Sequence, residues 1–169
     1  MRDLILAVRL SKKLKEQAIA KLKEHGVIAV GGEGNETYFV LHPSTMNPGW
    51  WQVSSFRDDG PIGHAENENK DSAISWALEG YPTEHHRVVT EQEFVALTST
   101  PKYFEGSRRV TFTQLDNTLR YETGIGALDV GVARPYLDAA WAAQDIEEGI
   151  KHLQAGIKEI RARKSARRT

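Results

Sequence analysis

Apolar residues recur every three or four positions in some parts of the chain and every second position in others. The first spacing is typical of amphipathic helices and the second of half-buried strands. Near the N-terminus, Leu14, Ala18 and Leu22 have the helical spacing and share one stripe. We expect Ser11 to cap this helix at its start and Gly26 to end it.

Short apolar runs between clusters of turn residues predict strands. Asp59 and Gly60 form a favoured hairpin pair between two such runs. The glycine-rich residues 31–36 also join two strand-like runs, which indicates a hairpin rather than a phosphate-binding loop, because such a loop would open a helix. The expected strands are residues 3–10, 27–30, 37–41, 50–56, 87–89, 107–115 and 117–123.

Two short helices are expected in the middle of the chain. One follows Asn69 and ends near Gly80, which can terminate a helix. The other begins after Thr90, because Thr90 and Glu93 have the spacing of a capping box before an apolar run.

A long C-terminal helix of about 30 residues is expected to begin at Pro135. Its apolar positions follow an uninterrupted a/d heptad pattern, which favours a homodimer. The alternative is that this helix packs across its own domain. Gly149 and Gly156 would weaken the helix. The expected seam residues are Ile146, Ile150, Leu153, Ile157 and Ile160.

These elements predict an α+β fold with an antiparallel or mixed sheet, short helices and a long C-terminal amphipathic helix. A chain of 169 residues is long enough to bury a core without a metal or a disulfide. We expect an α+β body in residues 1–133, an oligomerisation helix in 134–164 and a basic tail in 165–169.

The chain has no cysteine. This excludes disulfides, thiolate nucleophiles and cysteine-ligated metal centres, and it is typical of a reducing cytoplasm. No apolar run approaches the length of a membrane-spanning helix. We therefore expect a cytoplasmic protein with no membrane contact, no cofactor and no metal.

The formal net charge is −1, but the charges are unevenly distributed. Residues 1–25 carry +4, residues 26–107 carry −8, residues 108–148 carry −3 and residues 149–169 carry +6. The lysines of the N-terminal helix indicate a solvated face and, secondarily, a binding patch. A basic C-terminal end either solvates the chain or contacts nucleic acid. The candidate contacts there are Arg161, Arg163, Lys164, Arg167 and Arg168.

The acidic middle of the chain offers another mode of recognition. Its carboxylates would attract a basic protein if they gathered on one face. Trp50 and Trp51 add an aromatic candidate, since neighbours in a strand point to opposite faces and at least one should reach the core. We take Trp50 as the candidate partner contact.

Residues 55–66 come closest to a catalytic signature. His64 with Asp58 or Asp59 would make an acid–base pair or part of a metal site. Turn propensities explain the same residues as a hairpin, which is the preferred interpretation. A small hydrolase or transferase that uses His64 is the alternative.

The segment GWWQVSSFRDDGPIGHAENENKDSAISWALEGY, residues 49–81, resembles stretches in small accessory proteins of bacterial phages and plasmids. That resemblance implies a counter-defence or regulatory protein that binds host nucleic-acid machinery. The sequence as a whole favours a non-enzymatic binding protein, present as a homodimer, that acts on nucleic acid or on a nucleic-acid-handling protein complex.

Overall fold

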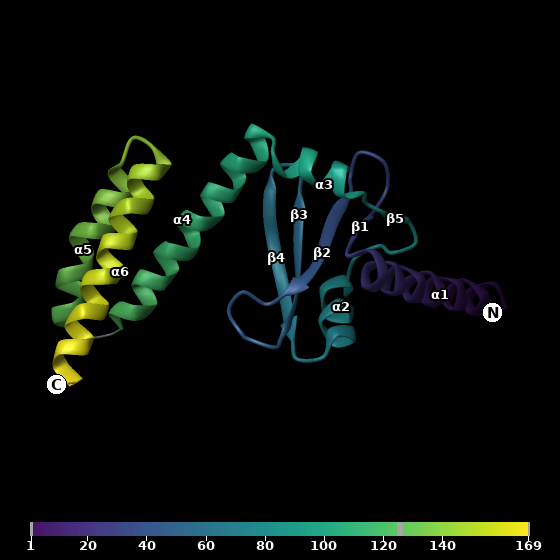
Figure 1. Ribbon diagram of the computed structural model, residues 1–169, viewed down its shortest axis with the longest axis horizontal. Coiled ribbons are helices and arrows are strands. Elements are labelled where there is room, and N and C mark those ends of the chain that lie inside the picture. Colours follow the sequence, from purple (N-terminus) through teal and green to yellow (C-terminus); the bar gives the residue numbers. More distant parts are fainter. Residues whose placement is uncertain (1, 125–126, 169) are drawn as a thin grey trace. The chain divides into compact units, whose positions relative to one another are not determined.

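The computed structural model describes residues 2–124 and 127–168, and the side chains of residues 3, 127–129 and 168 are outside this description. Within these residues it contains a five-stranded antiparallel sheet and six helices (Figure 1), which confirms the predicted α+β class. The elements in chain order are α1 (Arg2–His25), β1 (Val27–Val30), β2 (Thr37–Pro43), β3 (Trp51–Arg57), β4 (Gly60–Asn67), α2 (Lys70–Leu78), β5 (His86–Val88), α3 (Glu91–Thr98), α4 (Pro101–Thr123), α5 (Ala127–Ala142) and α6 (Ile146–Arg168).

The sheet has the strand order β4-β3-β2-β1-β5, and each pair of neighbours is antiparallel. Both predicted hairpins form, but the second turns at Asp58 and Asp59 instead of at the predicted pair Asp59 and Gly60. Val30 pairs with Thr37 across the glycine-rich connection, and Arg57 pairs with Gly60 across a two-residue turn. Gly60 has a φ of 127°, a conformation that side chains rarely adopt, which explains the glycine at this position.

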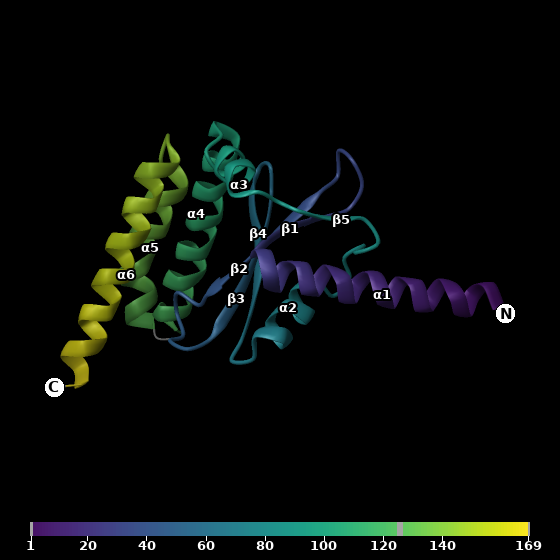
Figure 2. The same cartoon turned by 45° about the vertical axis from the view of Figure 1, so that its right-hand side comes forward.

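Each face of the sheet packs against different helices (Figure 2). On one face, Phe39 packs with Leu22 of α1 and Ile74 of α2, and all three are fully buried. On the other face, Phe56 contacts Phe94 of α3 edge to face, with ring centroids 5.7 Å apart. The apolar stripe predicted for α1 therefore packs, together with α2, against this face of the sheet.

Side-chain caps start both short helices, and the cap by Thr90 is the one that the sequence predicts. Asn69 accepts a 3.0 Å hydrogen bond from the backbone N–H of Ser72 at the start of α2. Thr90 accepts a 3.1 Å hydrogen bond from the backbone N–H of Glu93 at the start of α3. Each cap satisfies a backbone donor that has no partner within its own helix.

The strand predicted for residues 3–10 is wrong, because these residues form the first part of α1. Leucine, the commonest residue of the run, is a strong helix former, and the sequence has no glycine or proline before Gly26 that would break the helix. Ser11 therefore lies inside α1 rather than at its start, and its hydroxyl donates a 3.0 Å hydrogen bond to Glu84. The predicted end is confirmed, since α1 stops just before Gly26.

The two strands predicted for residues 107–123 are also wrong, because α4 runs through them without interruption. The apparent alternation conceals a helical spacing that places Phe112, Leu115 and Leu119 together in one apolar cluster. Asp116 lies between the two predicted strands, where it would favour a turn, but it is only 8% exposed within this helix. Packing between helices therefore overrides the turn propensity.

The single long C-terminal helix predicted from the sequence is two helices. The first, α5, begins before Pro135 and ends at Ala142, and α6 begins at Ile146. Asp145 caps α6 by accepting a 2.8 Å hydrogen bond from the backbone N–H of Glu148. This cap starts a new helix, so the helix is interrupted between Ala142 and Ile146 although the apolar heptad pattern is not.

The chain forms two compact units, residues 1–104 and residues 105–169. The predicted division after residue 133 falls inside α5. In the second unit, α4, α5 and α6 bury a shared apolar core. Its buried members are Leu119, Ala133, Ala140, Leu153, Ile157 and Ile160.

Gly149 and Gly156 are points of close packing in this bundle rather than weak points of a helix. A Cβ added at Gly149 would lie 2.8 Å from Cε2 of Phe112. A Cβ added at Gly156 would lie 2.8 Å from Cβ of Tyr136 and 2.9 Å from Cδ2 of Leu119. Both separations are shorter than carbon–carbon contact allows, so the two glycines permit the helices to approach.

Candidate interaction surface

The second half of α1 is anchored to the first unit. Ala18 and Leu22 are fully buried, and Lys23 forms a 2.9 Å ion pair with Asp71 of α2. Among the described side chains of α1, Ser11 is the first that hydrogen-bonds to the rest of the unit. The anchoring contacts therefore lie from Ser11 onward.

The first half of α1 extends away from the sheet in both ribbon views (Figures 1 and 2). We call residues 2–10 the free segment. Its large apolar side chains are 50% to 69% exposed, and they are Leu4, Ile5, Leu6, Val8 and Leu10. A helix that is apolar on most of its sides is normally buried, and exposed apolar patches mark interaction sites.

The basic side chains of α1 include a stripe along the exposed helix. Arg2, Arg9 and Lys13 are spaced by seven and four positions, which places them on one side, and Lys12 lies next to them. All four residues are exposed. Within the described part of the chain, Arg9, Lys12 and Lys13 form no ion pair with a carboxylate. We call Arg2, Arg9, Lys12 and Lys13 the basic stripe.

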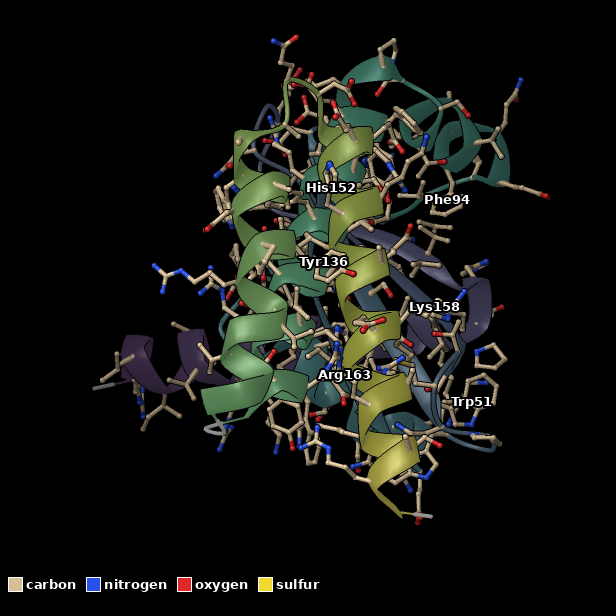
Figure 3. All side chains as sticks on the ribbon, turned by 90° about the vertical axis from the view of Figure 1, so that its left-hand side faces the viewer. Trp51, Phe94, Tyr136, His152, Lys158 and Arg163 are labelled. Carbon is tan, nitrogen blue, oxygen red and sulfur yellow. The ribbon has the colours of Figure 1, made fainter. Side chains whose placement is uncertain are left out.

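The basic end of α6, which the sequence predicts as a binding surface, contacts carboxylates of its own unit. Arg161 and Lys164 each lie 3.3 Å from a carboxylate oxygen of Glu122 on α4. Arg163, labelled on α6 in Figure 3, lies 2.9 Å from Glu159. Three of the predicted contacts therefore already have an anionic neighbour.

The two remaining predicted contacts of the tail are Arg167 and Arg168. Arg167 donates a 3.3 Å hydrogen bond to the backbone carbonyl of Arg163, and the side chain of Arg168 lies outside the described residues.

Both α1 and α6 contain seven basic and three acidic residues, a formal charge of +4 each. The two helices therefore differ in the pairing of their cations and not in their charge.

The predicted dimer seam is buried within its own chain. Ile150, Leu153, Ile157 and Ile160 are 0% to 6% exposed, and Ile146 is half-buried. This arrangement matches the alternative in which the helix packs on its own domain. A seam between two chains at these residues would have to expose the core of the bundle.

The predicted catalytic residues do not converge. Asp58 in the β3–β4 turn forms a 3.1 Å ion pair with Lys102, and Asp59 is exposed beside it. His64 is exposed on β4, and neither aspartate hydrogen-bonds to it among the described residues. These residues therefore build the hairpin that the turn propensities predict.

The sheet instead brings together polar side chains that sequence reasoning did not connect. Gln52 Nε2 donates to Ser54 Oγ at 3.2 Å, and Ser54 Oγ lies 2.9 Å from His42 Nε2. His42 Nδ1 lies 2.8 Å from the carbonyl oxygen of Pro43. Since a carbonyl can only accept, Nδ1 carries the proton and Nε2 accepts from Ser54. A serine beside an acceptor histidine is the arrangement of a nucleophile and a general base.

The two adjacent tryptophans have different environments. Trp51 packs against the core, with Lys70 Nζ 4.2 Å from its ring centroid. Trp50, the candidate partner contact, is 36% exposed where the chain enters β3. The prediction that at least one of them reaches the core is confirmed.

Acidic residues of the middle of the chain gather at one hollow beside α1. Glu33, Glu36 and Glu84 line this hollow of ≈ 580 Å³, but Lys21 and Arg87 line it too. Arg87 lies 2.7 Å from Glu36, and this contact offsets the charge of that carboxylate. The hollow therefore lacks the uniform negative charge that recognition of a basic protein requires.

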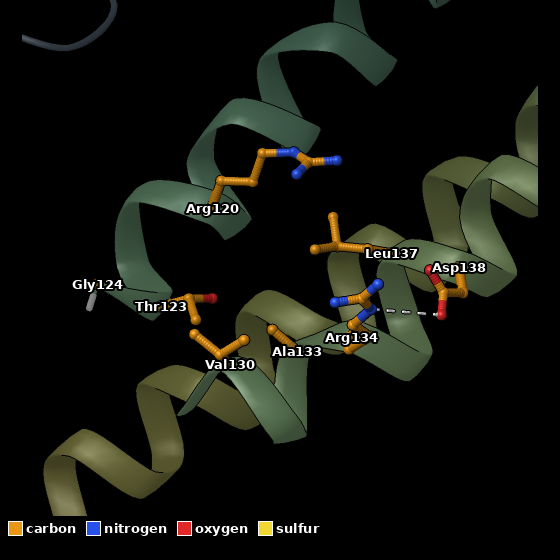
Figure 4. Close-up of a pocket in the computed structure, with 8 residues that line it drawn as sticks. All are labelled: Arg120, Thr123, Gly124, Val130, Ala133, Arg134, Leu137 and Asp138. Carbon is orange, nitrogen blue, oxygen red and sulfur yellow. Dashed lines mark ion pairs between the residues drawn. The ribbon is translucent and has the colours of Figure 1, made fainter. Parts of the chain in front are cut away.

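The second unit contains a cavity of ≈ 370 Å³ lined by residues of α4 and α5 and by Gly124 (Figure 4). Two arginines line it, and each has a carboxylate partner. Arg120 lies 3.0 Å from Asp116, and Arg134 lies 4.0 Å from Asp138. The paired charges give this cavity no clear preference for an ionic ligand.

Among the described residues, no group of three or more histidine, aspartate or glutamate side chains is placed to hold a metal ion. No described helix is both long and apolar enough to cross a membrane. Comparisons with protein family models, with curated proteins and with solved structures gave no match for this chain. The resemblance of residues 49–81 to phage and plasmid accessory proteins stays a prediction.

Sequence reasoning missed the free segment because its apolar run was interpreted as a strand. The signal that identifies this segment as helical is the spacing between its apolar residues and the buried residues further along α1. Leu4 and Val8 precede the buried Ala18 and Leu22 by two heptads each, so one helical stripe extends through the whole of α1.

Proposed function

We propose that this protein is a non-enzymatic nucleic-acid-binding protein and that the basic stripe of α1 is its contact surface. One observation carries the proposal. The helices α1 and α6 have the same formal charge, but their cationic side chains differ in how many have a carboxylate partner. Arg9, Lys12 and Lys13 of α1 have no carboxylate partner among the described residues. Arg161 and Lys164 of α6, by contrast, both pair with Glu122. Unpaired surface cations bind phosphates and release counterions.

Contacts of this kind do not depend on base sequence. They suit a regulatory protein that associates with nucleic acid, or with nucleic acid held by a protein complex. A counter-defence role for a phage or plasmid protein is a further step, and it rests on the resemblance of residues 49–81.

The test is fluorescence anisotropy with a labelled DNA duplex and a labelled single-stranded RNA at low salt. A triple variant with Arg9→Gln, Lys12→Gln and Lys13→Gln should weaken binding by about tenfold or more. The matched control changes three cations of α6, Arg161→Gln, Arg163→Gln and Lys164→Gln, and should change binding by about twofold at most. Absence of binding by the unmodified chain, or a larger loss in the α6 variant, contradicts the proposal.

A second candidate function is hydrolysis at Ser54, and the contact between Ser54 Oγ and His42 Nε2 favours it. The hydrogen bond of His42 Nδ1 to Pro43 sets the tautomer that a general base needs. A fluorophosphonate probe should then label the chain, and Ser54→Ala and His42→Ala should both abolish labelling. Labelling that survives Ser54→Ala, or no labelling of the unmodified chain, would exclude this function.

A further inference from the structure

We propose that the free segment of α1 pairs, in antiparallel orientation, with the free segment of a second copy of this chain. Residues 4–10 read LILAVRL and are nearly symmetric about Ala7. Leu4 and Leu10 lie three positions on either side, and Leu6 and Val8 lie one position on either side. A surface with this symmetry is complementary to itself across a two-fold axis.

A two-fold axis near Ala7 brings Leu4 of one copy toward Leu10 of the other. The small side chain of Ala7 lies at the crossing point, where it lets two helices approach closely. Helical spacing places Arg9 nearly opposite Ala7 and Lys13 about 120° around the helix from it. Pairing therefore leaves the basic stripes of both copies exposed, and the association does not depend on the nucleic-acid binding proposed above.

The apolar stripe that anchors α1 to its own unit supports this occupant. Leu4 and Val8 continue the stripe of Ala18 and Leu22, which are fully buried against the sheet. The stripe thus extends beyond the part of α1 that the chain itself covers, and a second α1 supplies an apolar surface of the same length and composition.

The size of the patch sets the expected strength of this pairing. An aliphatic side chain presents on the order of 100 Å² of apolar surface, so the four within about 100° of Ala7 on the helix, which are 58% to 69% exposed, present roughly 250 Å² per copy. These four are Leu4, Leu6, Val8 and Leu10. Pairing would bury roughly 500 Å² in total, which is below the size of a standard stable interface. We therefore expect a reversible dimer with a dissociation constant on the order of 10 μM.

The first test is sedimentation equilibrium of the full chain, without nucleic acid, over a range of concentrations around this value. The Leu4→Glu plus Leu10→Glu variant should raise the dissociation constant at least about tenfold while circular dichroism stays unchanged. The control is Ile62→Glu plus Val95→Glu, which charges two other apolar side chains, 47% and 52% exposed, and should leave the dimer intact. A monomer at every concentration, or a dimer that the α1 variant does not weaken, overturns the proposal.

The second test locates the axis by cross-linking. Because the chain has no cysteine, Ala7→Cys introduces a single thiol at the proposed crossing point. Mild oxidation should link two copies of this variant, whereas Arg9→Cys, on the opposite side of the helix, should form no disulfide under the same conditions. Equal linking of both variants, or of neither, overturns the proposed crossing point at Ala7. A chain that stays monomeric but binds vesicles of phosphatidylserine and phosphatidylcholine through Leu4 and Leu10 assigns the segment to a lipid surface and also overturns it.

Discussion

The indole Nε1 of Trp141 donates a 3.0 Å hydrogen bond to Oδ1 of Asp116, a residue 25 positions earlier in the chain. Arg120 Nε donates to the other carboxylate oxygen at 3.0 Å, so both oxygens of this nearly buried group have a partner. The ring of Trp141 also meets Phe112 edge to face, with centroids 5.1 Å apart. These contacts join α5 to α4 within one chain.

Replacement of Trp141 by phenylalanine keeps an aromatic ring beside Phe112 but removes the N–H donor. Asp116 then loses one partner while it stays buried, so we expect the free energy of unfolding to fall by about 1–2 kcal/mol. Urea denaturation followed by far-UV circular dichroism measures this loss. In the Asp116→Ala background the same replacement should cost less, and an equal cost in both backgrounds would mean that the hydrogen bond does not stabilise the bundle.

Gly156→Ala should destabilise the second unit although alanine is the better helix former. The added methyl group would overlap Tyr136 and Leu119, and overpacking of this kind costs about 1–3 kcal/mol. Gly131→Ala on α5 is the matched control, because a Cβ there meets no atom within 4 Å. The control should stabilise the helix by up to about 1 kcal/mol, and a similar gain for Gly156→Ala would contradict the packing described here.

The Ile150→Asp plus Ile157→Asp variant should unfold the second unit rather than release a folded monomer. Both side chains are nearly inaccessible in the bundle, so each new carboxylate would be buried without a partner, at a cost of several kcal/mol, roughly 4 or more in total. Loss of helical circular dichroism measures the effect. A variant that keeps its helical content while its mass falls from that of a dimer to that of a monomer would instead support the dimer seam predicted from the sequence.

The link between Glu122 and α6 should make stability depend on pH. Chiefly a hydrogen bond from Lys164, assisted by one from Arg161, lowers the pKa of Glu122 below its ordinary value of 4.5. The ionised group therefore stabilises the fold above that value, and this stabilisation is lost as the pH falls from about 4.5 through the lowered pKa.

The Glu122→Gln variant tests this dependence. It should lose less than about 1 kcal/mol at pH 7, because the partner side chains are partly exposed, and it should weaken the decline in stability below pH 4.5. Denaturation curves at pH 3, 4, 5 and 7 compare the two chains. An unchanged decline in the variant would show that another group causes it.

Local signals in the sequence predict the sheet unit well, apart from the start of its first helix. The Asn69 and Thr90 caps and the turn before Gly60 satisfy backbone groups within a few residues, so their geometry depends little on the rest of the chain. The turn before Gly60 also determines the structure of residues 55–66, which form a hairpin in which neither aspartate hydrogen-bonds to His64 among the described residues.

Local signals fail where contacts between distant residues decide the structure. Asp116 favours a turn by its own propensity, but the hydrogen bond from Trp141 holds it inside α4. The heptad pattern of α6 correctly identifies buried positions, yet it cannot distinguish a partner helix in the same chain from one in a second copy. The polar chain of Gln52, Ser54 and His42 likewise depends on strand register, which brings these side chains together only in the folded sheet.

The salt dependence of DNA binding tests the central claim most directly. Each phosphate contact contributes about −0.9 to the slope of the logarithm of the binding constant against the logarithm of the salt concentration. The Arg9→Gln, Lys12→Gln and Lys13→Gln variant should therefore have a slope that is shallower by about 2 to 3 than that of the unmodified chain. Equal slopes for the two chains, or a slope near zero for the unmodified one, would contradict the assignment of α1 as the nucleic-acid contact.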